Sequence, residues 1–273
     1  MVSDMHVHTS FSSDSFTPPE AQIERAIEMG MKHICITDHQ DYYYPPAQYN
    51  FLIGGDGNLE PYISKLEDLK EKYKGKIEVL TGIEFGLQPF LCAKYDEVYK
   101  QYPFDLVIGS THVFDGHDTE DIELYEFRER KESILDYFET EYRNLKRTNG
   151  YDVVGHMDFI LRDVPGKNNE FSILDYYDIL DEIVQLLIRK DKAIEINTKS
   201  LAVGMQDVSP SVMILGRYKK LGGKLITFGS DAHVPEAVGR EFQIASDILE
   251  VIGFDQYCIF RNHEPVFLPL ANR

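Results

Sequence analysis

The sequence predicts an α/β fold, a single-domain barrel of seven parallel strands joined by crossover helices. Short apolar or β-branched runs alternate with helical patterns along the chain, which is typical of a parallel sheet. Polar residues that can ligate metals follow nearly every one of these runs. In a barrel the carboxyl ends of all strands meet on one face, whereas an open doubly wound sheet gathers its site at one crevice.

The length and composition of the chain are compatible with one large domain. Its 273 residues, of which 43% are hydrophobic, can bury a large core. Barrels of this size commonly form one domain. Because no shift in composition divides the sequence, we expect a single domain over residues 1–273.

The expected strands are short, apolar or β-branched runs, each compatible with burial on both faces. In chain order they are residues 2–6, 33–37, 77–85, 104–110, 152–156, 193–198 and 225–230.

The expected helices are longer segments that lie between these strands. The first has the clearest limits, because Thr17 and Glu20 form a capping box around Pro18 and Gly30 ends the pattern. The helices are predicted at residues 18–29, 60–73, 125–147, 173–189, 210–221 and 235–252.

Three polar segments, residues 41–58, 115–126 and 162–171, are expected to be loops. The first is longer than an ordinary connection, so it is a candidate lid or wall of a substrate site.

Charge and cysteine content narrow the classes of partner and compartment. The net charge of -18 disfavours a nucleic-acid or anionic membrane surface, which would need clustered Lys and Arg. The 3 cysteines are widely spaced, which makes a disulfide framework unexpected and favours a cytoplasmic protein. Neither a secretory signal nor a membrane-spanning segment is expected. The sequence does not indicate an oligomeric state.

Nine candidate metal ligands follow the expected strands. His6 and His8 alternate on the first strand, so both imidazoles point to the same side. Nitrogen and oxygen ligands without thiolates favour zinc, manganese or iron over a closed structural zinc site. Since one ion seldom uses more than about four to six protein ligands, nine indicate two or three ions. The nine are His6, His8, Asp14, His39, Glu84, His112, His156, Asp231 and His233.

The motifs that contain these residues resemble, in order, those of the PHP (polymerase and histidinol phosphatase) superfamily. Segments 104–110, 155–158 and 195–198 are similar to its monofunctional histidinol-phosphatase branch. The resemblance covers nearly the whole chain and implies a distorted, TIM-like seven-stranded βα barrel with a trinuclear metal centre. The motifs are His6-Val7-His8 with Asp14, Thr37-Asp38-His39, Gly82-Ile83-Glu84, Ser110-Thr111-His112, Gly155-His156 and Ser230-Asp231-Ala232-His233.

The resemblance also implies how three divalent ions, of zinc, manganese or iron, would share the ligands. Many superfamily members carry histidine at the position of Asp14, so the metal at that position is the least defined. One ion would be held by His6, His8, Glu84 and Asp231, a second by Glu84, His112 and His156, and a third by Asp14, His39 and His233.

The activity that the resemblance implies is hydrolysis of L-histidinol phosphate to L-histidinol and phosphate, a late step of L-histidine biosynthesis. Water held between cations would ionise near neutral pH and attack phosphorus, without a Ser or Cys nucleophile. Asp231 and His233 are candidates for carrying a proton to the leaving alkoxide. Asp38 and Asp158 are candidates for orienting ligand imidazoles.

The predicted substrate contacts are a few cations and loop residues near the strand ends. Arg162, Lys199 and Arg240 are expected to bind phosphate, because each follows a strand that carries a ligand or lies beside one. Asp115, Asp118 and the tyrosines at 42–44 are candidates for the ammonium and imidazole of histidinol.

Two alternatives stay open. One is another phosphoesterase of the superfamily, with a different monoester substrate or with phosphodiesterase or nuclease activity; the acidic charge disfavours a nuclease. The other is a metal-binding regulatory domain without catalysis, which would be expected to lack some ligands, whereas all nine are present.

Overall fold

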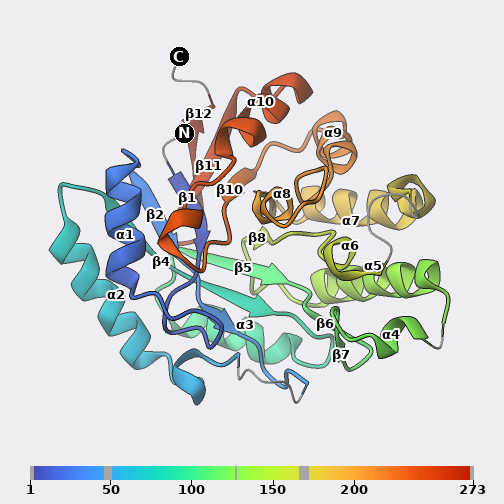
Figure 1. The fold of residues 1–273 in the computed structure, drawn as a ribbon, viewed down its shortest axis with the longest axis horizontal. Coiled ribbons are helices and arrows are strands. Elements are labelled where there is room, and N and C mark those ends of the chain that lie inside the picture. The colour runs from blue at the N-terminus through green and yellow to red at the C-terminus, as the bar shows by residue number, and fades with distance from the viewer. Residues whose placement is uncertain (1–2, 46–50, 127, 166–171, 271–273) are drawn as a thin grey trace.

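The strands form a nearly closed parallel barrel (Figure 1). The structure is a computed structural model that describes residues 3–45, 51–126, 128–165 and 172–270. The end strands meet at a bridge between Val7 and Ala232. In barrel order the strands are β1 (Ser3–Val7), β2 (His33–Ile36), β4 (Glu78–Gly86), β5 (Leu106–Ser110), β8 (Val153–Val154), β9 (Ala193–Asn197) and β10 (Ile226–Gly229).

All seven predicted strands are confirmed. Every residue of β1, β5 and β9 is buried, as expected for strands covered on both faces. β8 is shorter than predicted, and Val2, where the first strand was predicted to begin, lies outside the described residues. The short β3 (His39–Gln40) pairs with β4 and continues the sheet beyond β2.

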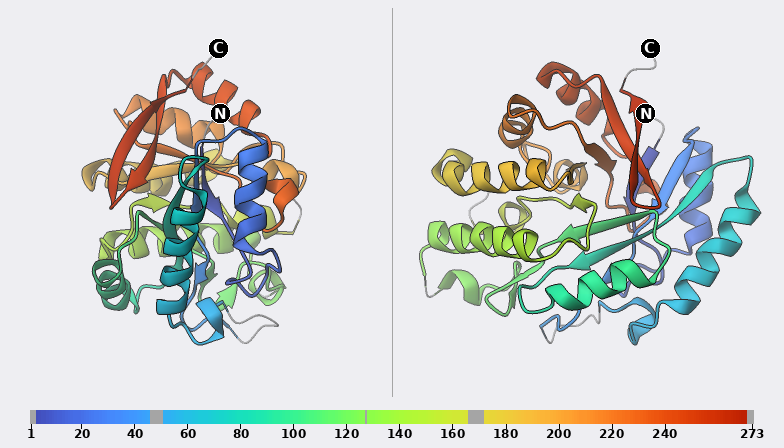
Figure 2. Two further views of the ribbon diagram at one scale, coloured as in Figure 1. Left: turned by 90° about the vertical axis from the view of Figure 1, so that its left-hand side faces the viewer. Right: turned by 180° about the vertical axis from the view of Figure 1, so that it is seen from behind.

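Helices surround the barrel on its outside (Figure 2). α2 has the limits predicted for the helix at 60–73. The helix predicted at 125–147 is observed as two helices, α4 (Glu123–Glu126) and α5. The helix predicted at 235–252 is likewise divided into η3 (Pro235–Ala237) and α10. The principal helices are α1 (Pro19–Glu28), α2 (Glu60–Tyr73), α3 (Cys92–Gln101), α5 (Arg130–Arg147), α7 (Tyr177–Arg189), α9 (Val212–Lys220) and α10 (Phe242–Ile252).

Shorter elements complete the described chain. The sequence did not predict α3 or any of the short elements at the strand ends. These are η1 (Ile53–Gly55), β6 (Val113–Phe114), β7 (His117–Asp118), α6 (Ile160–Asp163) and α8 (Lys199–Ala202). The predicted helix at 173–189 is observed as η2 (Ile173–Tyr176) followed by α7. Of the predicted loops, residues 46–50 and 166–171 lie outside the described residues, and the loop at 115–126 contains β7 and α4.

The capping box predicted at the start of α1 is wrong. α1 has no side-chain cap, and Pro18 is the residue that precedes its first turn. Thr17 Oγ1 instead donates to the carbonyl of His233 at 2.9 Å, and Ser15 Oγ donates to the same oxygen at 2.8 Å. The hydroxyls therefore join the loops after β1 and β10. Gly30, with φ +76, follows the end of α1 as predicted.

A hairpin of β11 (Gln256–Arg261) and β12 (Glu264–Pro269), which the sequence did not predict, lies at the amino-terminal ends of the strands. Arg261 Nε is 2.6 Å from the carboxylate of Glu78, the first residue of β4. His263 Nδ1 is 2.8 Å from Asp152, just before β8. The hairpin thus covers one end of the barrel and leaves the other end for the site.

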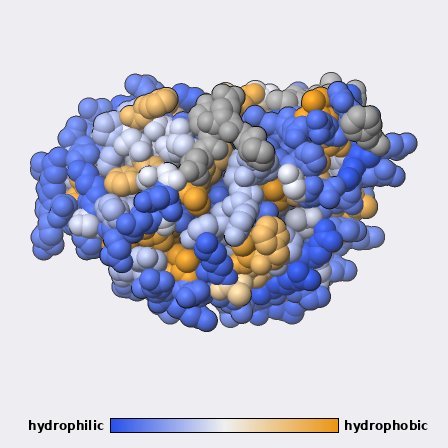
Figure 3. Space-filling view, turned by 90° about the horizontal axis from the view of Figure 1, so that it is seen from below, coloured by the Kyte–Doolittle hydropathy of each residue, from blue (hydrophilic) through white to orange (hydrophobic). Residues whose placement is uncertain are grey.

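The surface seen from below the view of Figure 1 is largely hydrophilic, with hydrophobic side chains in separate small areas (Figure 3). No helix in the described ranges is both long and apolar enough to cross a membrane.

Candidate metal centre

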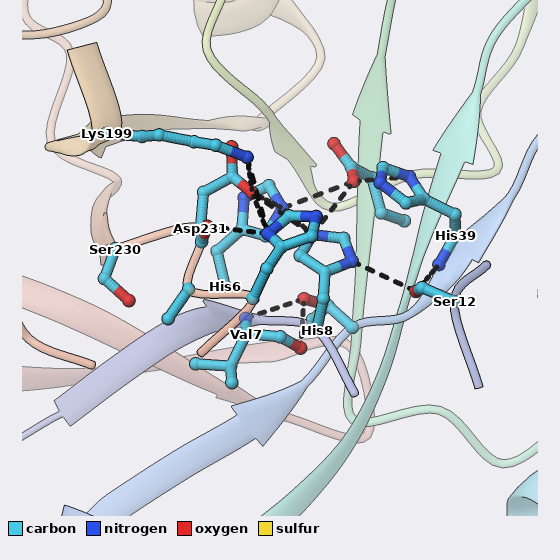
Figure 4. Close-up of polar contacts among 12 residues, drawn as sticks. His6, Val7, His8, Ser12, His39, Lys199, Ser230 and Asp231 are labelled. Carbon is cyan, nitrogen blue, oxygen red and sulfur yellow. Dashed lines mark hydrogen bonds and ion pairs between the residues drawn. The ribbon is translucent and has the colours of Figure 1, made fainter. Parts of the chain in front are cut away.

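The structure brings all nine predicted ligands together at the carboxyl ends of the strands. His6 lies on β1, His39 on β3 and Glu84 on β4, and the others lie in the connections that follow β1, β5, β8 and β10. Figure 4 shows His6 and His8 beside each other, with the Lys199 side chain directed at Asp231.

Glu84 lies at the middle of the cluster. Its two carboxylate oxygens are fully buried among imidazoles, and Oε2 has no hydrogen-bond partner. Burial opposes its ionisation, but His6, His112 and His39 outweigh burial and hold the pKa of Glu84 well below its usual range. The nearest imidazole nitrogens are those of His39 and His156 at 3.0 Å, His112 at 3.2 Å, His6 at 3.3 Å and His8 at 3.4 Å.

The two imidazoles of β1 direct the same nitrogen at each other, with His6 Nε2 2.9 Å from His8 Nε2. His6 Nδ1 donates to Glu195 at 2.6 Å, and His8 Nδ1 faces Ser12 Oγ at 3.3 Å. Because Ser12 Oγ itself donates to Asp38, it accepts from His8. Both Nε2 atoms are therefore left with lone pairs for a cation.

The charge state of His8 also suits a ligand. Burial and the neighbouring imidazoles of His233 and His39 hold its pKa well below its usual range. The rings of His39 and His233 stack on it, each with its centroid 4.2 Å away. His8 is thus kept in the neutral form that binds metals.

Asp14 belongs with His39 and His233. Its Oδ2 is 2.8 Å from His233 Nε2 and 3.6 Å from His39 Nε2. Its other oxygen is buried and has no hydrogen-bond partner. These three residues are the group that the family resemblance implies for a third ion.

The ligand atoms form one connected cluster in which the groups share members. His6 shares one set with Asp231 and another with His156, and His39 shares one set with His112 and another with His233. These two imidazoles therefore lie between the groups predicted for different ions. Among the nine residues, sets with ligand atoms within 4.8 Å of one another are His8, His39 and His233; His6, His8 and Asp231; His6, Glu84 and His156; and His39, Glu84 and His112.

The prediction that Asp158 orients a ligand imidazole is wrong, whereas Asp38 acts on the imidazole of His8 through the hydroxyl of Ser12. Asp38 accepts from Thr9 and Ser12, including the Thr9 backbone N at 2.7 Å. Asp158 accepts from Ser209 Oγ and from the Ser211 backbone N. Asp158 therefore organises a loop, and Asp38 fixes the hydroxyl that accepts from His8.

Two residues that the sequence reading missed do contact ligand imidazoles. Glu195 accepts from His6 Nδ1, and Asp41 Oδ2 lies 2.6 Å from His112 Nδ1. Burial lowers the pKa of His112, but Asp41 and Glu84 outweigh it and raise that pKa to about 9. A signal for Glu195 was present, since a lone carboxylate inside the apolar run 193–197 must find a buried partner.

The structure brings two of the three predicted phosphate-binding cations to the cluster. Lys199 Nζ is 3.0 Å from Asp231 Oδ1 and 3.4 Å from His233 Nδ1. Arg162 lies over the ring of Phe159 at 3.9 Å. Arg240 is exposed and does not line the cleft, because it follows η3 in the turn that leads away to α10.

A cleft of about 500 Å³ opens over the cluster. One end is lined by predicted ligands, including Asp14, His39 and Asp231, and Arg162 and Lys199 also line it. The remaining wall has four carboxylates, three aromatic rings and one aliphatic side chain, from Asp41, Asp118, Glu120, Asp163, Tyr44, Phe51, Phe159 and Val203.

Comparisons with known proteins identify the family of the chain. A model of the PHP domain family matches residues 4–199. A histidinol-phosphatase of Lactococcus lactis is 29% identical over 94% of this chain and 93% of its own length. A probable histidinol-phosphatase of Clostridium acetobutylicum is 32% identical over 92% of this chain and 93% of its own.

A solved structure has the same fold. The crystal structure of histidinol phosphate phosphatase from Lactococcus lactis, complexed with zinc, L-histidinol and phosphate, has a TM-score of 0.86 and 27% sequence identity. The match covers 97% of this chain and 98% of that chain.

Proposed function

Because the chain belongs to the PHP domain family, we propose that it hydrolyses L-histidinol phosphate to L-histidinol and phosphate, a step of L-histidine biosynthesis, and that residues 1–273 form one PHP-type domain. Relatives named histidinol-phosphatase support the activity, as does the similar structure that holds zinc, L-histidinol and phosphate. The observation that carries the proposal is the cleft, where a buried cluster of ligand-type side chains adjoins a wall of carboxylates and aromatic rings.

The nine residues fit divalent ions, and we propose three, of zinc, manganese or iron, shared as the sequence implies. Nitrogen lone pairs of His6 and His8 face each other at 2.9 Å, and Glu84 Oε2 is buried without a donor. Such an arrangement of acceptors calls for a cation. When bound, divalent ions lower the pKa of water and neutralise charge on phosphoryl oxygens.

The cations and carboxylates around the cleft have separate tasks in this proposal. Arg162 and Lys199 bind phosphoryl oxygens, for which a guanidinium and an ammonium are suited. Asp231, 3.0 Å from Lys199 Nζ, and His233 are the proposed carriers of the proton that the leaving alkoxide takes up.

The carboxylates in the cleft wall suit a substrate whose leaving group is cationic. Of the residues predicted to receive the ammonium and imidazole of histidinol, Asp118 and Tyr44 line the cleft, and the Tyr44 hydroxyl donates to Asp118. Asp115 does not line the cleft and is paired with Arg128 at 2.7 Å. Glu120 adds a carboxylate beside Asp118. A phosphomonoester with a positive charge at its far end fits this distribution.

Asp118→Asn is expected to raise KM for L-histidinol phosphate about tenfold, because a hydrogen bond to a charged group contributes about 1.5–3 kcal/mol. The kcat/KM for p-nitrophenyl phosphate, which has no cationic group, should stay unchanged. Steady-state phosphate release measures both. Asp115→Asn, on the same loop and outside the cleft, is the matched control and should alter neither. Equal losses on the two substrates would contradict a role in specificity.

The proposed function is tested by phosphate release from L-histidinol phosphate, other phosphomonoesters and a dinucleotide diester, with metal content measured on the same preparation. We expect the highest kcat/KM for L-histidinol phosphate and loss of activity after chelation. No preference for this substrate would refute the substrate assignment. Inactivity with zinc, manganese and iron would refute the enzyme assignment, and fewer than two ions per chain would refute a multinuclear centre.

A further inference from the structure

Glu195 contacts two predicted metal ligands that come from different strands. It lies on β9 and is 1% exposed. Its Oε1 accepts from His6 Nδ1 at 2.6 Å, and its Oε2 accepts from the backbone N of His156 at 2.8 Å and from Asn197 Nδ2 at 3.2 Å. One carboxylate thus links β1, β8 and β9 beneath the cluster.

The neighbouring strand β10 leaves room for this carboxylate through a glycine. A Cβ added at Gly229 of β10 would lie 1.9 Å from Glu195 Oε1, closer than real atoms approach. A Cβ at Gly155, after β8, would lie 2.3 Å from Ser110 Oγ and 3.6 Å from Glu195 Oε2. Gly229 therefore accommodates the carboxylate where it lies, whereas Gly155 is required by Ser110 and not by Glu195.

Only a carboxylate satisfies these contacts, since every partner of Glu195 is a donor. Accepting from Nδ1 fixes the tautomer of His6 and leaves its Nε2 lone pair directed at the cluster. A glutamine would have to place its NH₂ group against either the His6 N–H or the His156 N–H. One of the two ligands would then lose its support.

We propose that Glu195 is a positioning residue that couples two metal positions, by holding His6 for the first ion and His156 for the second. The inference rests on the proposed metal centre. Asp41 provides the contrast, because it is hydrogen-bonded to His112 Nδ1 at 2.6 Å, whereas His39 Nδ1 lies 3.9 Å from its other oxygen, beyond hydrogen-bond distance. Loss of Glu195 should weaken two positions together, whereas loss of Asp41 should weaken one.

The test is calorimetric titration of the chelator-treated full chain with Zn²⁺. We expect Glu195→Gln to weaken two of the zinc-binding events about 10–100-fold each, the usual effect of removing a group that orients a ligand. Asp41→Asn should weaken one. Glu141→Gln is the matched control, because Glu141 on α5 is also 1% exposed, has neither oxygen hydrogen-bonded and lies outside the cluster; its zinc affinities should equal those of the wild type.

Absorption of the Co²⁺-loaded protein gives a second readout that simple destabilisation would not alter. The ligand-field bands should change in Glu195→Gln and stay the same in Glu141→Gln. If Glu195→Gln does not fold, the same measurements on Glu195→Asp test the proposal, since aspartate keeps the negative charge but shortens the reach of the carboxylate. Unchanged zinc affinities, or weakening of a single position, would overturn the coupling. A wild type that binds zinc but does not hydrolyse L-histidinol phosphate would refute the proposed function and leave this test valid.

Discussion

Glu84→Gln is expected to lower kcat/KM for L-histidinol phosphate at least about 1000-fold and to release bound metal. Glu84 is fully buried, and five predicted ligand imidazoles lie within 3.4 Å of its oxygens. An amide would present N–H groups to nitrogens that carry lone pairs and would remove one oxygen shared between positions. Losing metal catalysis worth about 4 kcal/mol corresponds to about a 1000-fold rate loss.

Metal analysis and steady-state kinetics on the same preparation check this result. Glu78→Gln is the control, because Glu78 begins the same strand at its opposite end and is paired with Arg261. Its side chain is 39% exposed, so we expect unchanged activity and a stability loss under about 1 kcal/mol. Wild-type metal content in Glu84→Gln would mean that Glu84 does not bridge ions.

The barrel could be predicted because buried parallel strands are continuous apolar runs with a polar residue at the end. β10 lies within the predicted 225–230, and β9 within 193–198. The same alternation of strands and helices predicts that the nine ligand-type residues lie on one face of the barrel.

The features that the sequence did not predict depend on contacts across long separations. Glu195 and His6 are 189 residues apart, and Asp41 and His112 are 71 apart, so no local spacing pairs them. The hydroxyl of Thr17 could accept from an N–H group at the helix start or donate to a distant oxygen, and in the structure it donates to the carbonyl of His233. The turn of the β11–β12 hairpin has positive φ at Asn262 and His263. Of these two residues, only Asn262 is of a type that predicts such a turn from sequence.

Gly229→Ala is expected to destabilise the protein and weaken its metal centre together. The added Cβ would lie 1.9 Å from Glu195 Oε1 and 2.7 Å from His6 Cβ. Both neighbours are buried, so the strand or the two side chains must move. Overpacking of this kind costs about 3 kcal/mol, which corresponds to a fall in Tm of about 6–12 °C in a chain of this size. Displacing Glu195 should also weaken zinc binding about 10–100-fold.

Gly216→Ala separates this steric effect from the general effect of replacing glycine. Gly216 lies within α9, and a Cβ there would meet nothing within 4 Å. Because alanine has the higher helix propensity, Gly216→Ala should raise stability by up to about 1 kcal/mol. The same added atoms thus stabilise α9 and destabilise β10, and thermal melts of the two variants with zinc titrations measure the difference. Wild-type Tm and zinc affinity in Gly229→Ala would mean that Glu195 can move away without loss, and its role in coupling two metal positions would fall with this prediction.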